Sequence, residues 1–242
     1  MINSFTFNGI SSEALGLYVG GQNTFNAPLR DVTKVSIAGR NGDLVRDNGR
    51  FLNVQVAYNV VAMEDFTETA LAVRNWLLSV NGYARLEDTY HPDHFRMARV
   101  SDTITFETSA FNHTGKAQVI FDCKPQRFLK DGETEVSMAK NGSTANRTIT
   151  NPTPFESRPL IRVLGDGDGT ITVGNQIITL TGIDEYVDID SETMNCFKGA
   201  TNCNSQVALG TKGFPVLPSG DTTFAMTGGV TGAKVTGRWW EL

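Results

Sequence analysis

The chain has 242 residues, a net charge of −5 and 40% apolar residues, which is enough material to build one large or two small hydrophobic cores. The acidic balance, without any block of Lys and Arg, disfavours binding to nucleic acid, and the longest apolar runs are too short to span a membrane. The N-terminus lacks the basic and apolar stretches of a secretory signal, so we expect a protein made and folded in a cytosol.

The stretch SIAGRNGDL, residues 36–44, predicts a turn between two strands. Residues 32–37 favour a strand, and no helix follows the turn, which argues against a phosphate-binding loop. Gly39 and Gly42 then meet a backbone demand for positive φ. Arg40 lies on this turn, where it is either a plain exposed arginine or one that binds a partner's carboxylate. We take Gly39, Arg40 and Gly42 together as a structural turn and a candidate interface.

Residues 51–60, FLNVQVAYNV, alternate apolar and polar side chains and predict a half-buried antiparallel strand, the second strand beside this turn. The short apolar run at residues 117–121 is typical of a central strand.

One segment has the helical period instead of the strand period. Steps of four and three between apolar residues predict a single amphipathic helix at about residues 65–80, packed across a sheet. Asp65 is the expected N-cap, and Asn81 with Gly82 supplies the stop. The expected buried face consists of Phe66, Ala70, Val73, Leu77 and Val80.

The composition changes after residue 130, where a polar stretch rich in turn formers and proline indicates a domain boundary. Short strands at regular spacing follow, including a two-residue hairpin loop at Gly174 and Asn175, and this pattern favours a β-sandwich. The sequence therefore predicts a mainly β protein with two sandwich domains, residues 1–130 with one packed helix and residues 131–242.

Two groupings superficially resemble metal sites. His91 and His94 flank a Pro-Asp pair without a third ligand nearby, so a solvated turn is the favoured interpretation. The GDGDG segment around Asp166 and Asp168 lacks the glutamate register of a calcium loop, and we interpret it as a tight turn.

Two further groupings bear on catalysis and redox chemistry. Asp188 and Asp190 point the same way along a strand, as a glycosidase pair could, although acids at strand ends are common. Cys196 and Cys203 could share a hairpin, and with Cys123 we expect three buried or half-buried thiols. We therefore expect no catalytic residues, no metal site and no cofactor.

Five segments in this order resemble the distal tail proteins of siphophages, a family found at the tip of long non-contractile tails. The segments are VSIAGRNGDL (35–44), the helix end and following strands WLLSVNGYARLEDTYHPDHFRMARV (76–100), AQVIFDCKPQRF (117–128), TITNPTPFESRPLIRVLGDG (148–167) and GFPVLPSGDTTF (213–224). The resemblance extends over nearly the whole chain.

The resemblance implies a first sandwich with one helix that closes into a ring of six copies, and a galectin-like second sandwich at the ring's periphery. It implies a structural hub at the virion tail tip, assembled in the bacterial cytoplasm. The implied partners are further copies of the chain, the tail tube protein, the tail-associated lysin or receptor-binding proteins, and the tape measure protein. The family has no active site to carry over, and we expect no nucleic acid or membrane among the partners.

The alternative function is that of a carbohydrate-binding, lectin-like module for host adsorption. No loop is long enough for the inserted carbohydrate-binding module of some family members, and Trp239 and Trp240 are adjacent, so at most one can face a sugar. The third function class is an enzyme, such as a glycosidase or a peptidase.

Overall fold

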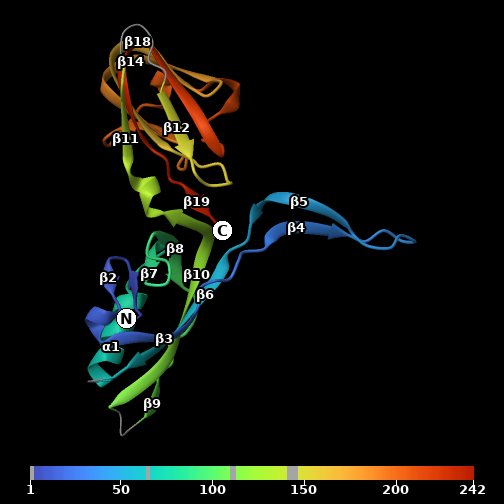
Figure 1. The fold of residues 1–242 in the computed structure, drawn as a ribbon, viewed down its shortest axis with the longest axis vertical. Coiled ribbons are helices and arrows are strands. Elements are labelled where there is room, and N and C mark those ends of the chain that lie inside the picture. Colours follow the sequence, from blue (N-terminus) through green and yellow to red (C-terminus); the bar gives the residue numbers. More distant parts are fainter. Residues whose placement is uncertain (1–2, 64–65, 110–112, 141–146) are drawn as a thin grey trace. The chain divides into compact units, whose positions relative to one another are not determined.

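The computed structural model describes residues 3–63, 66–109, 113–140 and 147–242. The chain divides into two compact units, residues 1–127 with Leu242 and residues 128–241. Both units are built from antiparallel strands as β-sandwiches, and one α-helix belongs to the first (Figure 1). In the described residues no helix has the length and apolarity needed to cross a membrane.

The sheet of the first unit has the strand order β2-β1-β7-β8-β10-β6-β3, and β9 pairs with β10. A backbone bridge between Asn3 and Val19 links the β1 end of this order to β3, so the sheet curls back on itself. The strands are β1 (Phe5–Phe7), β2 (Ile10–Ser11), β3 (Leu17–Asn23), β6 (Val54–Ala62), β7 (Ala84–Asp88), β8 (His94–Val100), β9 (Glu107–Ser109) and β10 (Thr114–Leu129).

The predicted alternation is confirmed in β6, where every second side chain is buried. The strand begins at Val54, later than the predicted residue 51, because Phe51 ends a different strand. The buried Tyr58 of β6 packs its ring against Phe5 and Phe121 at centroid distances of 4.9 and 6.0 Å. These aromatic contacts join strands β1, β6 and β10 in one core.

The predicted helix is confirmed as α1 (Phe66–Leu78), and its expected N-cap Asp65 lies outside the described residues. The helix buries Ala70, Val73 and Leu77 as predicted, while Phe66 and Val80 are partly buried against the same core. The helix also buries Trp76, whose indole Nε1 donates to the backbone oxygen of Phe7 at 3.1 Å. That bond satisfies the only polar atom of the side chain.

The second unit is an eight-stranded antiparallel sheet whose longest strands, β13, β14 and β18, pair side by side in the order β18-β13-β14. The predicted two-residue loop is confirmed, because β13 ends at Val173 and β14 begins at Gln176. The strands are β11 (Glu135–Ala139), β12 (Arg147–Asn151), β13 (Leu160–Val173), β14 (Gln176–Asp190), β15 (Asn195–Lys198), β16 (Thr201–Asn202), β17 (Val207–Ala208), β18 (Gly220–Thr236) and, paired with the end of β10, β19 (Trp240–Glu241).

The GDGDG segment is not the tight turn that we predicted. It lies inside β13, where the register with β14 and β18 shifts at β-bulges. A Cβ at Gly169 would lie 2.7 Å from the backbone oxygen of Thr227, so glycine is required for the close approach of two strands.

The closing segment packs within the second unit. Trp239 is buried in that unit's core, and the Trp240 ring stacks on Phe155 at a centroid distance of 4.4 Å. A Cβ at Gly132 would lie 2.5 Å from the Trp239 backbone nitrogen, so this glycine admits the final segment. The last strand is therefore an integral part of the second sandwich.

Candidate functional site

The first candidate site is a hairpin formed by β4 (Arg30–Val35) and β5 (Leu44–Phe51), which projects from the body of the first unit (Figure 1). Among the described residues these two strands pair only with each other, as a two-stranded sheet. Strand–turn–strand was predicted correctly, but the second strand is residues 44–51 and not residues 51–60. The alternation in residues 51–60 belongs to the core strand β6, whereas β5 is exposed on both faces and has no such period.

The turn at the tip of this hairpin has the expected backbone. Gly39 and Gly42 have φ angles of 77° and 80°, in the left-handed region that favours glycine. Apart from the adjacent residues, no atom in the described part of the chain lies within 4 Å of a Cβ added at either position. The preference for glycine therefore comes from the backbone conformation alone. Arg40 is exposed, and its side chain has no hydrogen-bond or ion-pair partner among the described residues. Its role as an interface residue stays a prediction.

The hairpin carries apolar side chains that are about half exposed to solvent. Val35 and Leu44, which are paired in register, are 47% and 51% exposed, and Val45 is 56% exposed. Ion pairs hold the strands together, between Arg30 and Asp47 at 3.0 Å and between Arg50 and Asp31 at 2.7 Å. Such exposed pairs contribute little stability, and a two-stranded hairpin is marginal alone. The hairpin therefore has the features of a segment that binds another surface.

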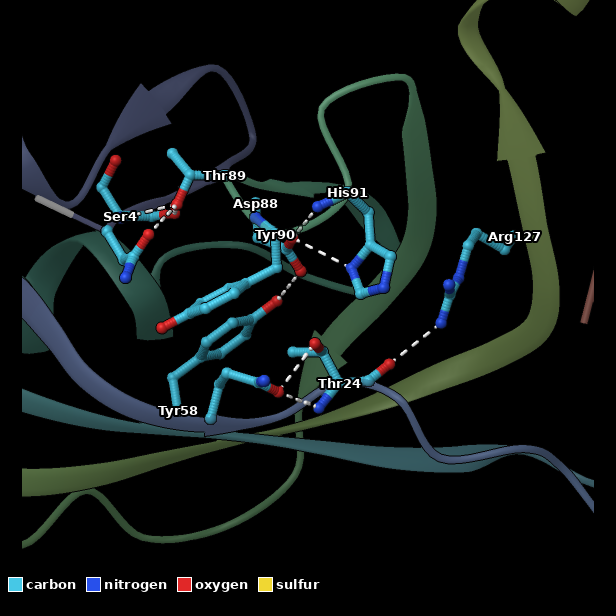
Figure 2. Close-up of polar contacts among 10 residues, drawn as sticks. Ser4, Thr24, Tyr58, Asp88, Thr89, Tyr90, His91 and Arg127 are labelled. Carbon is cyan, nitrogen blue, oxygen red and sulfur yellow. Dashed lines mark hydrogen bonds and ion pairs between the residues drawn. The ribbon is translucent and has the colours of Figure 1, made fainter. Parts of the chain in front are cut away.

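The second candidate site is a buried polar cluster in the first unit (Figure 2). The Tyr58 hydroxyl donates to Asp88 Oδ2 at 2.7 Å, and the backbone nitrogens of Tyr90 and His91 donate to Asp88 Oδ1 at 2.9 and 2.8 Å. The His91 ring nitrogen Nδ1 lies 3.2 Å from the same oxygen. Burial, followed by the Asp88 charge, raises the pKa of Tyr58 well above its ordinary value.

Two arginines complete this cluster. Arg127 Nη2 donates to the backbone oxygen of Thr24 at 2.9 Å, whereas its buried Nε has no partner among the described residues (Figure 2). Arg96 is 6% exposed, and both of its terminal nitrogens are buried without a partner in that part of the chain. Both arginines line a cavity of about 10 Å³ together with Asp88 and His91. Burial and the neighbouring Arg127 lower the pKa of Arg96.

The structure corrects the prediction for His91. His91 lies in a turn, as expected, but the turn is not solvated at this residue. The side chain is only 13% exposed and faces Asp88 and the cavity. Burial, followed by the charge of Arg127, lowers its pKa. His94 lines the same cavity at the start of β8. In the described residues no group of three or more His, Cys, Asp and Glu side chains is arranged to hold a metal ion.

The two strand acids are each held by an arginine. Arg162 binds Asp188 through Nε and Nη2 at 2.7 and 2.8 Å, and Arg238 binds Asp190 through Nη1 and Nη2 at 2.6 and 3.2 Å. Both carboxylates are buried, so their bidentate pairs fix strand β14 to β13 and to the closing segment.

The three cysteines are free and buried, as we predicted. Cys203 donates its backbone nitrogen to the backbone oxygen of Cys196 at 2.8 Å, which places the two in neighbouring parts of the β15–β16 hairpin. Burial raises the pKa of the Cys123 thiol to about 12 and that of Cys196 to about 11. These thiols are therefore protonated near neutral pH and unreactive.

The sequence could have indicated the exposed hairpin only through its turn, and it gave no signal for the buried cluster. Tyr58, Asp88 and Arg127 are far apart in the chain and have no motif spacing. From the sequence alone, a charged residue such as Arg96 is expected to be exposed. In the structure it is paired in register with the buried Leu86, so both side chains lie on the same, buried face of the sheet.

No protein-family model matches the sequence, and no curated protein matches it. The fold is similar to the crystal structure of the Dit (gp 19.1) protein of phage SPP1, described as a paradigm of the hub adsorption apparatus in phages that infect Gram-positive bacteria. That match has a TM-score of 0.77, covers 100% of both chains and has 14% identity. A chain of the phage P2 baseplate, in its activated conformation with Ca, matches with a TM-score of 0.54 and 9% identity, over 97% of each chain. This chain therefore has the fold of a phage hub protein.

Proposed function

We propose that the chain is a structural hub protein of a phage tail tip. It closes into a ring of six copies and joins the tail tube to the tail-associated lysin or the receptor-binding apparatus. The observation that carries the proposal is the match to the SPP1 Dit protein over the full length of both chains, at a TM-score of 0.77. The role is one of assembly and requires no catalysis. The virion tail tip is its place of action, after assembly in the host cytoplasm.

The hairpin β4–β5 supports this proposal, because it offers half-exposed apolar side chains, and an exposed Arg40 without a partner in the described part of the chain, for contact between neighbouring copies. A closed ring needs one surface that fits a different surface of the next copy. We propose that the hairpin supplies one of these two surfaces, and that the first unit forms the ring while the second unit is a galectin-like peripheral domain.

Sedimentation of the full chain tests the ring. We expect a species with about six times the 26.4 kDa of one chain. A variant carrying Val35→Lys with Leu44→Asp should sediment as a monomer and keep the far-ultraviolet dichroism of the wild type, because both side chains are about half exposed and the opposite charges face each other in register. The matched control is Ile177→Asp, which charges a 63% exposed apolar residue of the second unit and should leave the ring intact.

A monomer at every concentration, in the presence of the tail tube protein as well as alone, would contradict the ring. A ring that persists in the double variant would contradict only the role of the hairpin.

The carbohydrate-binding alternative receives less support. Trp239 is buried, and one face of the Trp240 ring is covered by Phe155. Binding to a glycan array by the full chain would reinstate it.

A further inference from the structure

The cavity beside Arg96 and Arg127 has an unbalanced charge. Asp88 is the one acidic residue among the described residues that line it, whereas Arg96 and Arg127 are both cationic. The lowered pKa of His91 keeps its ring neutral at neutral pH. The two guanidinium groups of the lining therefore outnumber its one carboxylate.

The carboxylate of Asp88 is already occupied by other donors. Its Oδ2 accepts from Tyr58, and its Oδ1 accepts from two backbone nitrogens and faces His91 Nδ1. Neither arginine forms an ion pair with it. Neutral donors thus fill the acceptor positions of the Asp88 carboxylate. The two arginines have no counter-ion at hydrogen-bonding distance in the described residues.

Arg96 is the residue of the cavity that most needs a ligand to satisfy its buried hydrogen-bond donors. Its side chain is more than nine-tenths buried, and both terminal nitrogens, each a hydrogen-bond donor, lack a partner in the described part of the chain. Leaving a buried cation without hydrogen bonds or an opposite charge is expensive. Arg127 Nε is a second buried donor without a partner in the same cavity lining.

The size of the cavity limits the ligand. About 10 Å³ of water-accessible space is room for one water-sized group, so the cavity favours a small spherical ligand over a tetrahedral oxyanion such as sulfate or phosphate. A water molecule would satisfy hydrogen bonds but would leave the excess positive charge. A halide ion is larger than water but is likewise a single spherical group, and it would both accept hydrogen bonds from the guanidinium groups and balance the charge.

We propose that this cavity binds one small monovalent anion of halide size, chloride in the cell, between Arg96 and Arg127. The anion serves as a fixed structural counter-ion for the core of the first unit. This inference is independent of the function proposed above, because it rests only on the buried cluster of a single chain.

Bromide provides the direct test, since it scatters anomalously and resembles chloride in size and charge. In crystals of the full chain grown in sodium bromide, we expect an anomalous peak within hydrogen-bonding distance of Arg96 and Arg127. A map that shows only water at this position would overturn the proposal, whatever the variants do.

Melting temperatures provide the test in solution. The wild-type chain should melt at higher temperature in sodium chloride than in sodium gluconate of equal ionic strength, with a saturable dependence on chloride, because a ligand that binds only the folded state stabilises it. Arg96→Met should abolish the difference. Arg74→Met, at an exposed position of α1, is the matched control and should retain it.

Equal melting temperatures of the wild type in the two salts would also overturn the proposal. So would a chloride effect that is the same in Arg96→Met as in Arg74→Met, because it would then arise from the general action of the salt. If Arg96→Met fails to fold, the bromide map of the wild-type protein still decides.

Discussion

His91 lies in a turn, yet its ring is removed from water. Its Nδ1 faces Asp88, and the Phe25 ring lies 4.7 Å from it, centroid to centroid. Burial and the charge of Arg127 lower its pKa below the ordinary value of about 6.5. The unfolded chain therefore takes up a proton at this position at a higher pH than the folded chain does.

The first prediction follows from this difference in proton uptake. As the pH falls through about 6.5, the unfolded state gains a proton that the folded His91 does not, so the free energy of unfolding decreases. In His91→Gln, the loss of stability between pH 7.5 and 5.5 should be smaller than in the wild type. Urea unfolding at both values measures it, with His113→Gln at an exposed position as the control. An identical loss in all three proteins would refute it.

The second prediction concerns the glycines of the hairpin turn. Gly39→Val or Gly42→Val should cost more than about 1 kcal/mol, because a β-branched residue strongly disfavours positive φ. No neighbouring atom restricts the new side chain, so the cost is one of backbone strain confined to the hairpin. Faster amide hydrogen exchange in β4 and β5 would report it. Gly39→Asn should exchange as the wild type does, because asparagine tolerates this conformation.

At the scale of elements, the sequence was informative where one face of an element is buried. Strand β6 and helix α1 each have one exposed and one buried face, so apolar residues recur with a period of two in the strand and near 3.6 in the helix, and these periods predict both elements. Strand β5 is exposed on both sides, and its sequence LVRDNGRF has no period to detect. The GDGDG segment was misread because repeated glycine also marks close approach between strands, as at Gly169 and Gly229.

The buried cluster could not have been predicted by the same reasoning. Its members come from separate strands and a turn, and each one taken alone has an ordinary local context. Only the register of β7 with β8, which places Arg96 opposite Leu86, turns that arginine inward.

The third prediction concerns the helix. Leu77 is 1% exposed in the first core, so Leu77→Ala should lower the free energy of unfolding by roughly 2–5 kcal/mol. Arg74 is exposed on the same helix, and Arg74→Ala should change it by less than about 0.5 kcal/mol. Chemical denaturation of both variants measures the difference. If Leu77→Ala left the free energy of unfolding unchanged and Arg74→Ala lowered it strongly, the assignment of the buried face would be wrong.

At the scale of the whole molecule, each of the two units has its own hydrophobic core. The closing segment belongs to the second core through Trp239, and Arg238 neutralises the buried Asp190. Removing this segment would leave an apolar cavity and a buried carboxylate without its cation, both of which are destabilising.

The fourth prediction is that a chain ending at Thr236 loses the fold of the second unit and keeps that of the first. Calorimetry should show the transition of the first unit at its wild-type temperature and no transition from the second. We propose that the ring persists in this truncated chain and in a chain ending at Lys130. Loss of the ring from both, with the first unit still folded, would show that ring contacts extend beyond residue 130.

The three tryptophans give the two units separate optical reporters. Trp76 is buried in the first unit, whereas Trp239 and Trp240 lie in the second. In Trp76→Phe, tryptophan fluorescence therefore comes from the second unit alone, and its emission maximum follows the unfolding of that sandwich without any attached dye. Because Trp240 stacks on Phe155, its near-ultraviolet dichroism should disappear together with the fold of the second unit when the closing segment detaches.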